Sequence, residues 1–286
     1  MADLYEMHDR PEVHEPVMVM TLEGWIDAGL GAAAAEAALL GALPSDRVAT
    51  FDADSLLDHR ARRPVVRIID GVNTALLWPE IQLRSGRTND GHDLLFLVGP
   101  EPDHQWRAFA RSVAELAGTF GVQMMIGLGA FPAPVPHTRP SRLASTATTT
   151  ELAHQVGFLP GTIDVPAGVQ AALERQFGEL GVPAVGLWAR VPHYAAAMPY
   201  PEASVVLLEG LERLTGIAVD TSELQNAAAN ARTRLDELIA NSEEHGALVR
   251  QLEAQADAES ERPFGTIPSG DELAAEVERF LREENS

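Results

Sequence analysis

Residues 122–140 read VQMMIGLGAFPAPVPHTRP, an apolar run followed by a proline-rich loop. The run over residues 122–128 is short enough to be a buried strand. Gly127 and Gly129 mark the end of that strand, at a point where the backbone must pass close to a neighbouring group. Each proline fixes φ and removes an amide donor, so we expect a stiff, non-helical connection. The four prolines are Pro132, Pro134, Pro136 and Pro140.

Two of these prolines flank the polar residues His137, Thr138 and Arg139. In open α/β sheets, ligands bind in the crevice beyond the carboxyl ends of the strands, so a rigid loop in that position is a candidate site. The sequence Val-Pro-His recurs at residues 191–193 after another apolar run, and we expect both histidines at the same rim of one sheet. The alternative is a purely structural loop, in which His137 and Arg139 satisfy neighbouring carbonyl groups.

The chain up to residue 216 alternates between predicted strands and helices. Strands are expected at residues 17–22, 47–51, 65–69, 75–83, 93–98 and 183–191, and helices at 30–43, 106–120, 168–180 and 203–215. Pro79 places the fourth of these strands at an edge or a bulge, because proline cannot donate to a sheet ladder. Asp103 is placed to cap the helix that begins at Trp106. This alternation predicts α/β layers, with helices on both faces of the sheet.

The last quarter of the chain is acidic, with 18 Asp and Glu residues against 7 Arg from Glu209 onward. Apolar residues spaced by three and four predict two amphipathic helices, separated near residues 241–246, that would form a helical hairpin. Ser269 and Glu272 form a capping box, which predicts a short terminal helix. We therefore expect an α/β domain over residues 1–216 and an acidic helical extension over residues 217–286.

The composition excludes several classes of protein. The 286 residues include no cysteine and no lysine, which rules out a cysteine nucleophile, a P-loop lysine and a Schiff-base lysine. The net charge of −21 opposes binding to nucleic acid, and the basic cluster of Arg60, Arg62, Arg63 and Arg67 is too short to reverse that. No apolar run approaches the length of a membrane span, and residues 1–16 do not resemble a signal peptide. We expect a cytoplasmic protein without nucleic-acid or membrane partners.

The turns after the predicted strands carry the candidate crevice residues Trp25, Asp27, Glu101, His137, Arg139 and His193. An acid, a base and a guanidinium in one crevice would suit a hydrolase or a phosphorylase. No nucleophile motif accompanies them, and the 56-residue separation of the two histidines carries no metal-ligand spacing. We therefore assign no catalytic residue, cofactor or metal. We expect Arg139 to form a partly buried ion pair with Asp27 or Glu101.

Five short motifs follow one another along the chain. They are GWIDAG at residues 24–29, DHRARRP at 58–64, GPEPD at 99–103, PHTRP at 136–140 and VPHY at 191–194. In this order they resemble the proteasome assembly chaperone family, and more narrowly its bacterial branch with a helical C-terminal extension. The resemblance covers residues 17–216. It implies a three-layer α/β/α sandwich, like that of nucleoside phosphorylases and hydrolases, with a helical C-terminal appendage.

The resemblance also implies a function, because eukaryotic and archaeal members bind proteasome subunits or their assembly intermediates, although bacterial members lack an established activity. We expect a non-catalytic protein-binding or assembly-chaperone-like protein that forms a homo-oligomer. Proteasome subunits are the candidate protein partner. The alternative is a cryptic hydrolase or phosphorylase that acts on a small polar metabolite, in a crevice at the carboxyl edge of the sheet.

Overall fold

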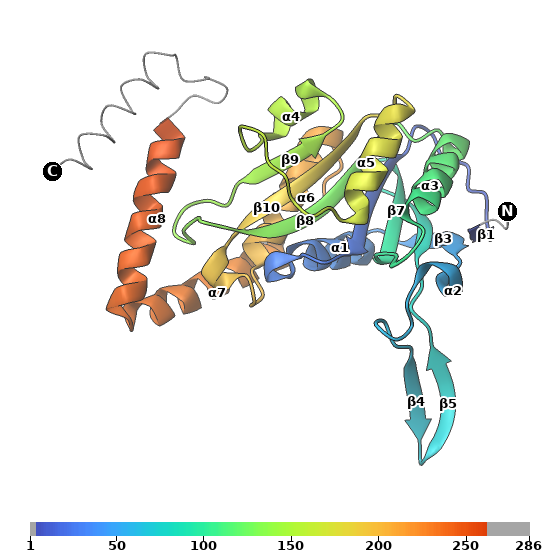
Figure 1. Ribbon diagram of the computed structural model, residues 1–286, viewed down its shortest axis with the longest axis horizontal. Helices are drawn as coiled ribbons and strands as arrows, with labels where there is room; N and C mark the ends of the chain where they lie inside the picture. The colour runs from blue at the N-terminus through green and yellow to red at the C-terminus, as the bar shows by residue number, and fades with distance from the viewer. Residues whose placement is uncertain (1–3, 262–286) are drawn as a thin grey trace.

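The computed structural model describes residues 4–261, which form one eight-stranded sheet with helices on both faces (Figure 1). The strand order is β1-β3-β6-β7-β2-β8-β10-β9. The four central strands are parallel: β7 (Asp93–Pro100), β2 (Val17–Glu23), β8 (Met124–Ala133) and β10 (Ala184–Pro192). Antiparallel strands complete the sheet, with β6 (Gln82–Arg87), β3 (Ser45–Phe51) and β1 (Tyr5–Met7) on one side and β9 (Leu143–Ala147) on the other.

Two of the longer helices pack on each face of the sheet. Helices α1 (Gly31–Ala42) and α6 (Pro201–Thr215) contact each other on one face, and α3 (Trp106–Phe120) and α5 (Val169–Glu179) do so on the other. The small residues of α1 allow a close approach to α6, where the Ser204 hydroxyl donates to the Gly31 carbonyl at 2.9 Å. Two buried apolar clusters fill the spaces between the layers. The predicted three-layer α/β/α sandwich is therefore confirmed.

The single strand predicted over residues 75–83 is divided between β6 and a separate hairpin, which also contains the strand predicted over residues 65–69. The hairpin strands β4 (Val65–Ile69) and β5 (Val72–Leu77) form a two-stranded sheet of their own, which projects from the sandwich (Figure 1). The two-residue turn is Asp70-Gly71, and both residues adopt the positive φ that such hairpins favour. The predicted strand is wrong because β5 ends before Pro79, which lacks the amide that a continuous strand would need.

Three local expectations also need correction. Helix α3 starts after Gln105, which has a φ of 58°, and Asp103 does not cap it. The Asp103 carboxylate instead accepts a hydrogen bond from the Asp58 amide at 2.8 Å, because the chain before the hairpin packs against this turn. Strand β8 runs on through Gly127, Gly129 and the first proline to Ala133, so the glycines lie inside the strand. Residues 143–147, where no strand was predicted, form β9.

Helices α2 (Ala53–Leu56) and α4 (Thr150–Val156) are short, and 3-10 turns over Ala28–Leu30 and His193–Ala195 follow β2 and β10. The C-terminal part contains α7 (Ser222–Ala240) and α8 (Glu243–Glu261), and the break at Asn241 is where the sequence predicts it. Figure 1 shows α7 and α8 meeting at a corner.

The division into two domains near residue 216 stays a prediction, and the expected terminal helix from Ser269 lies outside the described residues. Within the described part of the chain, no helix is both long and apolar enough to cross a bilayer.

Candidate functional site at the carboxyl edge of the sheet

The carboxyl ends of the four parallel strands lie at one edge of the sheet. Strands β8 and β10 run in register, with Pro192 opposite Ala133, so the loops that carry His137 and His193 leave the same rim as predicted. Tyr194 lies between the two histidines, with its ring centroid 5.8 Å from that of His137 and 5.4 Å from that of His193. Of the six candidate residues, three line one cavity of this edge, Arg139 lines a second cavity, and the two histidines line neither.

The first cavity, with a volume of about 330 Å³, lies beyond β2 and β8 and beside the first turns of α1 and α5. We call it the tryptophan–carboxylate cavity. It brings together three of the six candidate residues, Trp25, Asp27 and Glu101, and adds Trp188 and Glu36. The Asp27 carboxylate accepts hydrogen bonds from the Ala32 and Ala33 amides at the start of α1. Glu101 is buried and accepts from the Val169 amide at the start of α5.

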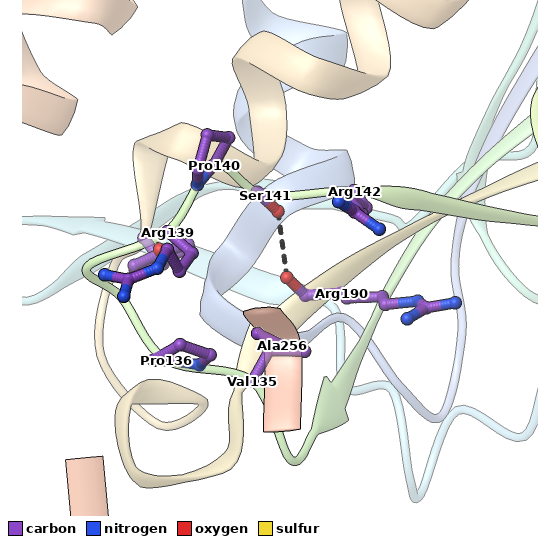
Figure 2. Close-up of a pocket in the computed structure, with 9 residues that line it drawn as sticks. Val135, Pro136, Arg139, Pro140, Ser141, Arg142, Arg190 and Ala256 are labelled. Atoms are coloured by element: carbon purple, nitrogen blue, oxygen red, sulfur yellow. Dashed lines mark hydrogen bonds between the residues drawn. The ribbon is translucent and has the colours of Figure 1, made fainter. Parts of the chain in front are cut away.

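The second cavity, with a volume of about 100 Å³, lies under α8 at the loop between β8 and β9 (Figure 2). We call it the arginine pocket, because Arg139, Arg142 and Arg190 line it. Figure 2 shows the Ser141 hydroxyl donating to the Arg190 carbonyl at 2.9 Å, a bond that ties the loop to β10. Ala256 of α8 is one of the lining residues, so the C-terminal helix forms part of the wall of this pocket.

His137 lines neither cavity, and its side chain is almost fully buried, with 1% exposed. Its Nδ1 atom lies 2.7 Å from the Tyr194 hydroxyl and its Nε2 atom lies 3.1 Å from Asp236 of α7. Burial raises the pKa of the Tyr194 hydroxyl above its ordinary value, and the nearby carboxylates add to the shift. Because the phenol therefore stays protonated at neutral pH, this chain of contacts fastens α7 to the loop and supplies no phenolate.

The position of Arg139 contradicts the ion pair expected from the sequence. Its guanidinium binds Asp257 through two hydrogen bonds of 2.7 and 2.8 Å, and it contacts Glu253 at 3.3 Å. Both acids lie on α8, one helical turn apart, whereas Asp27 and Glu101 line the other cavity. The sequence reasoning missed them because a partner more than 110 residues away has no local signature. The sequence shows that this helix is acidic, but it does not show that the cation bound by the helix is Arg139 of the same chain.

Removing this contact is expected to loosen α8 without unfolding the sandwich. In Arg139→Ala, amide hydrogen exchange in α8 should become faster, because both acids lose their cation while the core remains intact. Arg139→Lys should give an intermediate rate, since lysine restores the charge but not the two parallel hydrogen bonds. Arg175→Ala is the matched control, because it removes an exposed pair with Glu179 on α5. Unchanged exchange in α8 of Arg139→Ala would show that the ion pairs do not hold the helix.

A buried polar pair between the sheet and α5 was also missed. Glu174 accepts hydrogen bonds of 3.0 Å from the Gln170 side chain and from the Thr146 hydroxyl. Side chains on Gly127 and Gly186, which lie opposite each other in β8 and β10, would overlap this pair. The close approach predicted at Gly127 is therefore real. The only local signal for the buried pair of Gln170 and Glu174 is a glycine in each of two strands. The sequence does not show that these two strands are adjacent.

Within residues 4–261, no group of three or more histidine and acidic side chains is placed to hold a metal ion. The observed geometry is that of an α/β/α sandwich whose carboxyl edge is partly covered by its own C-terminal helices. The protein is therefore an α/β/α sandwich protein, and comparison with known proteins identifies its family.

The chain belongs to the PAC2 family, whose model matches residues 21–239. A protein of unknown function from Corynebacterium glutamicum is 32% identical, with a TM-score of 0.84, over 91% of this chain and 98% of that one. A proteasome-assembly chaperone homologue from Mycobacterium tuberculosis is 31% identical, with a TM-score of 0.76, over 82% of this chain and 99% of that one. A comparison with curated proteins finds no match.

Proposed function

We propose that this PAC2-family protein is a non-catalytic binding protein that self-associates and assists the assembly of proteasome-type complexes. Family membership and the similarity to a proteasome-assembly chaperone homologue support the assembly role. The exposed hairpin of β4 and β5 supports self-association, and it is the observation that carries the proposal.

The hairpin exposes apolar side chains on both of its faces. Val65, Ile68 and Val72 are 64%, 61% and 62% exposed, although they belong to residue types that are usually buried. The other exposed large apolar residues of this segment are Val66, Ile69, Leu76, Leu77 and Trp78. An isolated two-stranded hairpin is at best marginally stable in water, and an apolar patch of this kind marks a protein interface. The hairpin therefore needs a partner surface.

Charge favours a second copy of this chain as that partner. Arg60, Arg63 and Arg67 lie on the hairpin or just before it, whereas the whole chain carries a net charge of −21. Arg62, beside them, already pairs with Asp103 at 3.4 Å. A basic, apolar projection from one copy would therefore meet an acidic surface on another copy, and complementary charge favours such an encounter. The turn between the strands contains a single acid, Asp70.

Charging the hairpin is expected to dissociate the oligomer into folded monomers. We expect the double variant Val65→Asp, Ile68→Asp to elute at the monomer mass by size-exclusion chromatography with light scattering. Burying two carboxylates in an apolar contact would carry a large desolvation cost. The matched control is Val165→Asp, Ile163→Asp, which changes the same residue types at 69% and 58% exposure in the loop before α5. A monomeric wild-type protein, or an equal effect of the control, would contradict self-association through the hairpin.

The assembly role needs a separate measurement. Purified proteasome α and β subunits from the same organism are mixed with the protein, and complexes are identified by native mass spectrometry. We expect a complex with unassembled subunits and faster formation of the complete ring. If no complex forms with either subunit at low and moderate salt, the assembly role is refuted, whatever the outcome for the hairpin variants.

The geometry does not favour the enzymatic alternative. A hydrolase or phosphorylase site would need the histidines and the guanidinium to face the carboxylates across one crevice. Trp25, Asp27 and Glu101 line one cavity, Arg139 lines the other, and His137 contacts α7. We therefore propose no reaction for this protein.

A further inference from the structure

The tryptophan–carboxylate cavity is acidic, and it lacks a cation of its own. Among the described residues that line it there is no arginine and no histidine, although Glu23, Asp27, Glu36 and Glu101 are present. The remaining walls are largely apolar and include Ile26, Leu30 and Leu128. A phosphate or a carboxylate ligand would meet only like charge here. The cavity is therefore unsuited to an anion.

The four carboxylates fall into two groups. Asp27 and Glu101 are used by the fold, because they accept amide hydrogen bonds at the starts of α1 and α5. Glu23 and Glu36 form no ion pair with any residue of the described chain. Burial raises the pKa of Glu36, repulsion from Glu23 adds to the shift, and a hydrogen bond with Thr21 opposes it. A cation bound between these two carboxylates would relieve both the burial cost and the repulsion.

Two indole rings are held at the same cavity. Trp188 donates its indole N–H to the Thr146 hydroxyl at 3.1 Å, and its ring occupies space that a side chain on Gly129 would fill. Trp25 lies beside Gly168, where an added Cβ would sit 3.6 Å from its ring, and the side chain is nevertheless 58% exposed. Tryptophan presents the best aromatic face for a cation. Packing in the core therefore does not account for an exposed tryptophan in this acidic cavity, whereas contact with a bound cation would.

We propose that the tryptophan–carboxylate cavity binds a small organic cation, a protonated or quaternary amine with an apolar body. The rings of Trp25 and Trp188 would contact the body and the charged head, and Glu23 and Glu36 would neutralise the head. The volume of about 330 Å³ is at the lower end of the range for small-molecule sites. This site is independent of the hairpin and of the partner that an assembly role requires.

Calorimetric titration of the full-length protein with matched probes tests the proposal. The probes are phenethylammonium, its neutral analogue 2-phenylethanol and the anion phenylacetate, together with tetraethylammonium. We expect phenethylammonium to bind at least about tenfold more tightly than the alcohol, and phenylacetate not to bind. Equal binding of the amine and the alcohol would show that the cavity has no preference for a cation, and it would overturn the proposal. Absence of binding by both cations up to about 10 mM would refute the site.

Two pairs of variants locate the binding. Trp25→Ala and Glu36→Gln should each weaken phenethylammonium binding by at least about fivefold while leaving the melting temperature close to that of wild type. Trp78→Ala is the control for the first, because Trp78 is 50% exposed and lies next to the hairpin. Glu115→Gln, an exposed position on α3, is the control for the second. Equal weakening by a control and its test variant would place the binding elsewhere and overturn the assignment.

Discussion

Replacing Gly99 by alanine is expected to lower the free energy of unfolding by on the order of 4 kcal/mol. Gly99 lies near the end of β7 with a φ of 117°, a conformation that residues with a side chain rarely adopt. An added Cβ would overlap the Glu80 carbonyl oxygen and sit 3.0 Å from the Ile81 Cα atom. Both neighbours are backbone atoms at the entry to β6, so no side-chain rotation can relieve the overlap.

The same substitution should disturb the tryptophan–carboxylate cavity, because Glu101 follows two residues later and its carboxylate binds the start of α5. Gly91→Ala is the matched control. Gly91 also has a positive φ, of 96°, but nothing lies within 4 Å of an added Cβ, so only the backbone strain of about 1 kcal/mol is expected. Urea unfolding of both variants measures the difference. Equal losses would show that contact with Glu80 is not what requires glycine at position 99.

The layers of the fold could be predicted because each element has its own periodicity. The apolar runs of β2, β7, β8 and β10 and the amphipathic stripe of α3 identify buried strands and a surface helix without any knowledge of their neighbours. Parallel strands then bring the loops after β8 and β10 to one rim, which is why His137 and His193 were correctly placed together.

The hairpin and the arginine pocket show where local patterns stop being informative. The run from Ala75 to Leu83 is apolar enough for one strand, and only the proline at position 79 indicates that it divides. Nothing in the sequence says that β4 and β5 leave the sheet. Arg139 illustrates the same limit, because a guanidinium requires an acid but the sequence contains 42 of them. Arg139 pairs with the acids of α8 because the C-terminal helices fold back over the rim. That arrangement depends on tertiary packing, which the local sequence does not show.

The candidate site was predicted in part for the same reason. Trp25, Asp27 and Glu101 follow adjacent strands β2 and β7, so strand order alone brings them to one cavity. Trp188 and Glu36 complete that cavity from inside a strand and a helix, where the sequence suggests core or surface positions. Gln170 also lines it and connects it to Glu174, the one acid among the described residues for which burial moves the pKa to about 7.

Glu174 is expected to make the stability of this protein fall as the pH rises towards 7. Burial raises the pKa of its carboxyl group from 4.5 to about 7, and the hydrogen bonds from Gln170 and Thr146 only partly oppose that shift. Because the folded state holds the proton more tightly than the unfolded chain, the protonated acid causes no penalty below about pH 4.5. Between pH 4.5 and 7 the unfolded state ionises first, and stability is lost.

Glu174→Gln should remove this pH dependence, since glutamine keeps an acceptor for both hydrogen bonds and cannot ionise. We expect the variant to match wild type near pH 4.5 and to be more stable at pH 8 by on the order of 3 kcal/mol. Urea unfolding at a series of pH values measures the difference. Glu115→Gln, which removes an exposed negative charge from α3, controls for the change in net charge. If the advantage of Glu174→Gln is the same at pH 4.5 and pH 8, Glu174 does not titrate in this range and its burial has another compensation.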